Sequence, residues 1–178
     1  MSEVRIATVS LAGCFGCHMS LLDIDEAIIG LSRKVRFDRS PLTDIKSLGP
    51  CDIGIIEGAV ANDENVAVLK EFRQQCRTLV AMGACAINGG IPALRNGIPV
   101  TDCLQESYEQ GMGLVSRGVP NDPELPLLLD RVRTVSELVE VDVFLPGCPP
   151  PASLILDCLS ALLEGRPFEP DYTQLHYD

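Results

Sequence analysis

The chain has 178 residues, 46% of them hydrophobic, which fits one domain with a complete hydrophobic core. Its formal net charge of −11 and the lack of a basic stripe argue against nucleic acid as a partner and against docking on anionic lipid. No apolar run approaches the ~20 residues that a membrane-spanning helix needs, and the amino terminus has no secretion-signal pattern. We therefore expect a cytoplasmic protein, in which cysteines are seldom structural disulfides.

Apolar, β-branched segments alternate along the chain with segments of helical periodicity. The predicted elements, in chain order, are a strand at 4–11, a helix at 18–32, strands at 35–38 and 51–60, a helix at 64–76, a strand at 78–85, short helices at 102–111 and 131–139, a strand at 140–147 and a helix at 150–165. Strands that alternate with helices indicate a parallel sheet covered on both faces. We predict an α/β, flavodoxin-like doubly wound sheet in a single domain spanning 1–178, with 166–178 as a tail packed on a partner.

Four of the eight cysteines follow predicted strands. Cys14 and Cys17 come after the first strand, Cys85 ends the fourth, and Cys148 follows the fifth. In an open parallel sheet the loops after the strands emerge at one edge, where ligands bind. The fold would therefore gather four thiolates, as a tetrahedral metal or a cubane cluster requires. The other four cysteines are predicted to be small buried hydrophobes: Cys51, Cys76, Cys103 and Cys158.

The pattern Cys14-x-x-Cys17-His18 is compatible with several kinds of site. Haem attachment uses C-x-x-C-H, but it takes place outside the cytoplasm, and the motif falls here in a strand-to-helix turn. A redox dithiol fits locally but leaves Cys85 and Cys148 unexplained. Structural zinc accepts four thiolates equally well, usually from paired short knuckles. Because two of the ligands arrive singly on separate loops, we favour a [4Fe–4S] cluster at the carboxyl edge of the strands.

Four motifs in a fixed order resemble those of a known family. The set C-x-G-C-H-M-S, E-G, G-x-C-x-x-x-G-G and P-G-C-P-P, found between about residues 4 and 165, resembles the small subunit of [NiFe] hydrogenases. That superfamily includes the 20-kDa-type subunit of respiratory complex I, whose cysteines in the first motif are adjacent rather than spaced. The chain looks closest to the soluble, NAD-reducing (bidirectional) type. Small subunits of F420-reducing and sulfhydrogenase-type complexes are the nearest rivals.

The resemblance implies that Cys14, Cys17, Cys85 and Cys148 ligate the cluster proximal to a nickel–iron centre, which belongs to a separate large subunit. The chain would then be an electron-transfer subunit of a hydrogen dehydrogenase, inactive alone, that passes electrons to a diaphorase module with further clusters, FMN and NAD. An alternative of a different class is a flavodoxin-like flavin module with structural zinc. Against it, the loop after the first strand lacks a Ser/Thr-rich phosphate cradle.

Glu57 lies near the end of the third predicted strand, at the same edge as the cysteines. One hypothesis makes it a loop carboxylate that caps the backbone following it. The other makes it a buried acid at the large-subunit interface that serves proton movement or cluster orientation. His18 is predicted to begin the helix rather than to bond a cluster sulfide, and His176 in the tail is given no role.

Overall fold

A five-stranded parallel sheet forms the centre of the computed structural model, which describes residues 3–115 and 118–175. Its strands lie in the order β2-β1-β3-β5-β7. Their bounds are β1 (Val4–Ser10), β2 (Val35–Phe37), β3 (Cys51–Glu57), β5 (Cys76–Met82) and β7 (Val143–Leu145). Counted within this sheet the order is 2-1-3-4-5, the flavodoxin-like doubly wound arrangement. The predicted α/β class and mainly parallel sheet are confirmed.

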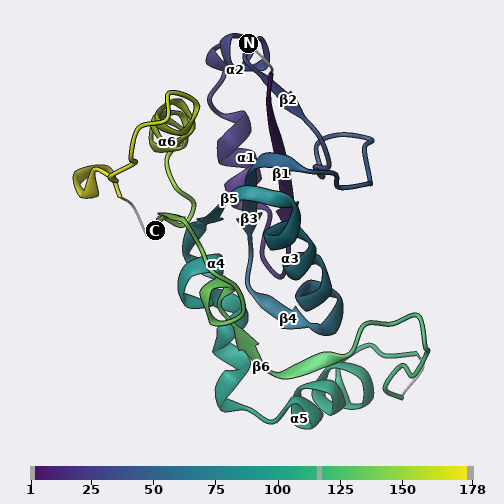
Figure 1. The fold of residues 1–178 in the computed structure, drawn as a ribbon. Helices are drawn as coiled ribbons and strands as arrows, with labels where there is room; N and C mark the ends of the chain where they lie inside the picture. Colours follow the sequence, from purple (N-terminus) through teal and green to yellow (C-terminus); the bar gives the residue numbers. More distant parts are fainter. Residues whose placement is uncertain (1–2, 116–117, 176–178) are drawn as a thin grey trace.

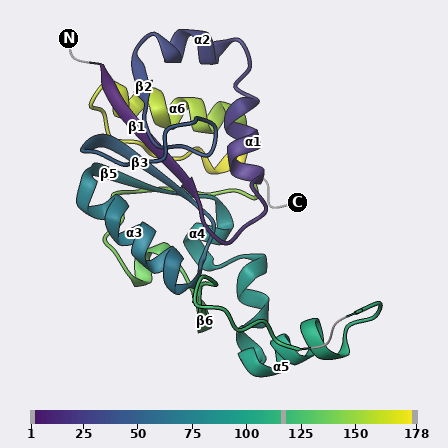
Figure 2. The ribbon, with the colours of Figure 1, turned by 90° about the vertical axis from the view of Figure 1, so that its right-hand side faces the viewer.

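Helices cover both faces of the sheet (Figure 1, Figure 2). One face carries α1 (Gly16–Leu22), α2 (Ala27–Ser32) and α6 (Ala152–Leu163), and the other carries α3 (Asp63–Gln75) and α4 (Gly83–Asn88). Neighbouring residues of one strand serve opposite faces: Ile55 packs in the first core and Ile56 in the second. This period of two is typical of strands that are buried on both sides.

The predicted helix at 18–32 is interrupted, because α1 ends at Leu22 and α2 begins at Ala27. Between them Asp25 adopts a left-handed backbone with φ 61°. An L-residue in that conformation cannot continue a right-handed helix. Ile24 is nevertheless buried, so the connection between the two helices keeps the apolar periodicity that predicted one helix.

The predicted helix at 131–139 is wrong. Residues there form the strand β6 (Leu128–Arg133) and a short 3-10 helix η3 (Val135–Glu137). β6 pairs antiparallel with β4 (Val60–Asn62), whose first residue falls at the end of the third predicted strand. β3 ends at Glu57 because Gly58 turns the chain with φ 88°. The result is a second, two-stranded sheet that the sequence pattern does not predict.

The described residues between α4 and β6 form an arm that extends away from the central sheet in both views (Figure 1, Figure 2). It contains a 3-10 helix η1 (Ile91–Gly97), α5 (Val100–Gln105) and a π-helix η2 (Glu106–Gln110), so the helix predicted at 102–111 is confirmed. Asn96 ties η1 to β6, because its amide accepts from the Val132 N–H at 2.7 Å and donates to the Val132 carbonyl at 2.9 Å. None of the helices in the two described ranges is long and apolar enough to cross a membrane.

Cys51 and Cys76 pair as a disulfide, which corrects their prediction as separate buried thiols. They stand in register at the starts of β3 and β5, with Cα atoms 4.7 Å apart. Gly54 leaves the room for this pair, since a Cβ there would lie 2.6 Å from the Cys76 Sγ. Cys158 is buried in α6 as predicted, and burial raises the pKa of its thiol to about 12. Cys103 on α5 is only half-buried, so its prediction as a core residue is wrong.

Asp142 joins three elements and gives the stability a testable pH dependence. Its Oδ2 accepts from the Leu79 N–H at 2.7 Å and from Arg73 Nη1 at 2.6 Å. Burial by itself would raise the pKa of Asp142, but the two hydrogen bonds and the Arg73 charge together lower it. The carboxylate therefore stabilises the fold above the unfolded-state pKa, and this contribution is lost as the pH falls through the lowered folded-state pKa.

We expect Asp142→Asn to destabilise the protein at pH 7 and to cost progressively less below about pH 4. The loss should be no more than about 1 kcal/mol, because the Asp142 side chain is 39% exposed. Thermal unfolding over this pH range measures it, with exposed Asp130→Asn as the control. A loss of equal size at pH 7 and pH 3 would contradict the assignment.

Candidate metal centre

The four cysteines singled out in the sequence lie on the loops and helix starts at the carboxyl edge of the central sheet. Cys14 is in the loop after β1, Cys17 in the first turn of α1, Cys85 in the first turn of α4, and Cys148 in the loop after β7. The four cysteines therefore lie at the edge of the sheet where the sequence analysis expected them. Cys85 differs in detail, because β5 stops at Met82 and Gly83, with φ 85°, turns the chain into α4.

One backbone hydrogen bond and one side-chain hydrogen bond fix these segments to one another. The Ala84 N–H donates to the Gly147 carbonyl at 2.8 Å, which joins α4 to the loop of Cys148. The Ser20 hydroxyl of α1 donates to the Pro150 carbonyl in the same loop at 2.6 Å. All three cysteine-bearing segments are thus held together by the protein's own groups.

Glycines leave the space that the sulfur atoms use. A Cβ at Gly83 would overlap the Cys17 Sγ. One at Gly90 would lie 2.8 Å from the Cys85 Sγ, and one at Gly16 would lie 3.2 Å from the Cys14 Sγ. At Gly83 and Gly90 a side chain would therefore require the neighbouring thiol to shift, and at Gly16 it would make a tight contact.

Gly147 supplies the turn before the fourth cysteine. Its φ of 138° brings the chain into Cys148, and a Cβ at Gly147 would overlap the Pro150 Cα. The Cys148–Pro149 peptide bond that follows is cis. Gly147 and Pro150 are buried, while Cys148 between them is half-buried and Pro149 is exposed.

The site disfavours free thiolates. Burial is the main cause that raises the pKa of Cys17, and the nearby charges of Glu57, Cys85, Cys14 and Cys148 raise it further. Burial is likewise the main cause that raises the pKa of Cys85. A metal ion that displaces the thiol protons would offset this burial and the repulsion between the thiolates with its positive charge.

A single metal ion and a [4Fe–4S] cluster place different demands on their cysteine ligands. Within residues 3–115 and 118–175, no group of three or more His, Cys, Asp or Glu side chains is arranged to hold one metal ion. A [4Fe–4S] cluster spreads its four cysteine ligands over separate irons and does not need that closeness. Four cysteine thiolates are the donor set that such a cluster requires.

Glu57 and His18 form a buried pair at this edge. Glu57 is 2% exposed, its Oε1 accepts from the Cys17 N–H at 3.2 Å, and its Oε2 accepts from the His18 N–H at 3.1 Å and contacts the His18 ring Nδ1. Glu57 thus caps α1 rather than the backbone that follows it. His18 begins the helix as predicted, but its ring is fully buried. His176 lies outside the described residues.

Two hydroxyl residues that the sequence analysis did not single out continue this pair. His18 Nε2 lies 2.9 Å from Thr8 Oγ1, which lies 2.7 Å from Ser40 Oγ. A threonine inside the apolar first strand indicates a buried polar contact, because a buried hydroxyl needs a hydrogen-bond partner. The partner's identity requires the fold, since Ser40 is 32 residues away.

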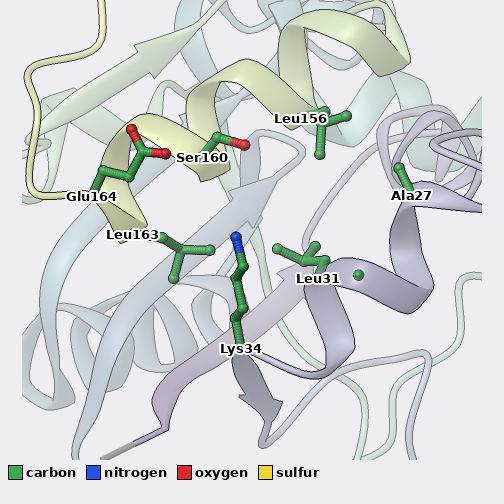
Figure 3. Close-up of a pocket in the computed structure, with 8 residues that line it drawn as sticks. Ala27, Leu31, Lys34, Leu156, Ser160, Leu163 and Glu164 are labelled. Carbon is green, nitrogen blue, oxygen red and sulfur yellow. The ribbon is translucent and has the colours of Figure 1, made fainter. Parts of the chain in front are cut away.

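A pocket of about 300 Å³ between α2 and α6 is separate from the cysteines (Figure 3). Leu31, Leu156 and Leu163 line it, together with Lys34 and Glu164. Lys34 directly precedes β2, and Glu164 directly follows α6. The pocket therefore lies toward the amino ends of the strands, and none of the four cysteines lines it.

Comparison with known proteins decides the family. A family model described as "NADH ubiquinone oxidoreductase, 20 Kd subunit" matches residues 14–162, a range that contains all four cysteines. The chain belongs to this family. Over 180 residues it is 41% identical to the delta subunit of the NAD-reducing hydrogenase HoxS of Cupriavidus necator, covering 99% of this chain and 86% of that protein. It is 34% identical to a subunit of the F420-non-reducing hydrogenase of Methanothermobacter thermautotrophicus, covering 97% of this chain but 58% of that protein.

Solved structures agree with the family assignment. A crystal structure of an NAD⁺-reducing [NiFe]-hydrogenase in the H₂-reduced state matches with a TM-score of 0.96 and 54% identity, over 99% of this chain and 100% of that chain. The [NiFeSe] hydrogenase of Desulfovibrio vulgaris Hildenborough matches with a TM-score of 0.61 at 20% identity, over 92% of this chain and 60% of that one, which shows a shared fold alone. The predicted resemblance to [NiFe]-hydrogenase small subunits, and to the complex I superfamily, is confirmed.

Proposed function

We propose that this chain is the electron-transfer small subunit of an NAD-reducing [NiFe] hydrogenase and that Cys14, Cys17, Cys85 and Cys148 hold its proximal [4Fe–4S] cluster. The observation that carries the proposal is the convergence of these cysteines at one sheet edge, with a glycine beside each. When bound, such a cluster supplies one-electron transfer between the NiFe centre of a large subunit and a diaphorase module with FMN and NAD.

The chain's own residues position the ligands and leave one side accessible. Cys17 is buried and Cys14 is exposed, so this chain's own residues do not cover all four cysteines. Large apolar side chains next to the cysteines are exposed: Met19 by 51% and Ile91 by 72%. Exposed apolar surface beside a redox site supports a partner subunit that covers this edge, as the large-subunit role requires.

We also propose that the chain acts as one cluster-binding domain whose tail, 166–178, contacts a partner. Phe168 and Leu175 pack against the core of this chain beside α6. Tyr172, between them, is 75% exposed and is accessible to a partner. Residues 176–178 lie outside the described residues, and the cytoplasmic location stays a prediction from the sequence.

Purification of the native complex through an affinity tag on this chain tests the proposal. We expect a large subunit and flavin-containing subunits to co-purify, with nickel, iron, acid-labile sulfide and FMN in the product and NAD⁺ reduced by H₂. Reduction of F420 without reduction of NAD⁺ would instead support the F420-reducing alternative. Zinc and flavin on this chain, without iron or sulfide, would overturn the proposal in favour of the flavin module.

A further inference from the structure

We propose that four buried polar side chains, Glu57, His18, Thr8 and Ser40, act together as a positioning network that holds Cys17 in place for the cluster. The inference rests on the proposed ligation of the cluster by Cys17. It assigns a role to His18, Thr8 and Ser40, of which the last two lie outside every cysteine motif in the sequence.

The network is built entirely in the interior. Glu57 and Ser40 are each 2% exposed, and Thr8 and His18 are fully buried. Within the described residues, every buried side-chain nitrogen and oxygen has a hydrogen-bond partner. An unpaired buried polar group is costly, so each of the four side chains is confined to the geometry that satisfies its neighbour. Such a set specifies one arrangement of its surroundings.

Glu57 supplies the cap that α1 lacks. The Cys17 and His18 N–H groups belong to the first turn of the helix, where they have no partner within the helix. Phe15, the residue before α1, has φ 67° and makes no side-chain cap bond. The carboxylate from the end of β3 takes both amides instead, at 3.2 and 3.1 Å. The backbone position of Cys17 is therefore set by Glu57.

His18, Thr8 and Ser40 in turn fix Glu57. The His18 ring contacts the carboxylate through Nδ1 and lies 2.9 Å from the Thr8 hydroxyl through Nε2. The Phe15 ring stacks on the His18 ring, with centroids 4.7 Å apart and planes within 4°. The Thr8 hydroxyl is held from its other side by Ser40, at 2.7 Å. The loop after β2 is thus connected to a candidate ligand through β1 and β3.

Thr8→Val is the most informative change, because valine keeps the branched shape and removes only the hydroxyl. Thr8 contacts no cysteine, yet its loss leaves one side of the His18 ring unpaired. In the purified complex we expect the reduced-cluster electron paramagnetic resonance signal to broaden and change its g-values. The cluster's midpoint potential should shift, and iron loss to a chelator should become several-fold faster. Thr78→Val on β5, in no contact with the network, is the matched control and should change none of these.

A double-mutant cycle separates a connected network from general destabilisation. Ser40→Ala should change the same spectrum less than Thr8→Val does, and combining the two changes should add little, because both act through His18. Ser40→Ala also serves as the test if Thr8→Val prevents assembly of the complex. If the two effects add fully, or if the variants leave the g-values and potential of the wild type unchanged, the inference is wrong. If the wild-type complex shows no cluster signal, the proposed function itself fails.

Discussion

Replacing Cys85 with serine is expected to remove the cluster and to reduce H₂-dependent NAD⁺ reduction by the complex at least ~100-fold, equivalent to ~2.7 kcal/mol in the activation barrier. Serine supplies no thiolate for iron. The backbone around residue 85 has little freedom to bring another ligand to the iron. The Cys85 Sγ lies against Gly90, and the Ala84 N–H holds α4 to the Gly147 carbonyl. Iron and sulfide content, the electron paramagnetic resonance spectrum and NAD⁺ reduction measure the result.

Cys103→Ser is the matched control for this change. Cys103 is also a half-buried, unpaired cysteine that begins no strand, but it lies on α5 in the arm. We expect its replacement to leave the cluster and the activity as in the wild type. Equal losses from both substitutions, or a Cys85→Ser complex with its full complement of iron and activity, would show that Cys85 is not a ligand.

The location of the candidate site could be predicted from the sequence because it depends on topology alone. Once strands were predicted before Cys14, Cys85 and Cys148, the rule that parallel strands end at one edge placed the three loops together. Local patterns were sufficient for that step. Side-chain detail within the loops was not needed, which is why the start of α4, missed in the sequence, left the edge assignment intact.

Contacts between residues far apart could not be predicted in the same way. Glu57 and His18 are 39 residues apart, and Cys51 and Cys76 are 25 apart, so no local pattern records either pair. Both pairings depend on register between β1, β3 and β5 and on where each strand stops. In the sequence, Glu57 was therefore equally compatible with a loop cap and with a buried acid.

The segment around Val132 shows a different limit. Alternation of Arg131, Val132 and Arg133 fits a strand, whereas the apolar spacing from Val132 to Val135 and Leu138 fits a helix. Pairing with β4 decides in favour of the strand, and Val132 becomes buried while both arginines stay exposed. A short segment with two possible periods requires its tertiary partner before its structure can be assigned.

Gly83→Ala is expected to displace Cys17 and to lower the cluster content of the complex sharply. Gly83 has φ 85°, a conformation that costs an L-residue about 1–2 kcal/mol. The new Cβ would also overlap the Cys17 Sγ, and the Gly147 carbonyl lies 3.6 Å from it on another side. Overpacking of this kind costs about 1–3 kcal/mol more. Iron content and the thermal midpoint of cluster loss measure both effects.

Gly113→Ala separates backbone strain from the clash. Gly113 has φ 81°, nearly that of Gly83, but a Cβ there meets no atom within 4 Å. This variant should therefore show only the conformational cost and keep its iron. The difference between the two variants, about 1–3 kcal/mol together with the missing iron, isolates the space that Cys17 needs beside Gly83. If both variants lose stability equally and both keep the cluster, then Cys17 can move away from Gly83 without leaving its ligand position, and the close packing of glycine on sulfur is not a requirement of the site.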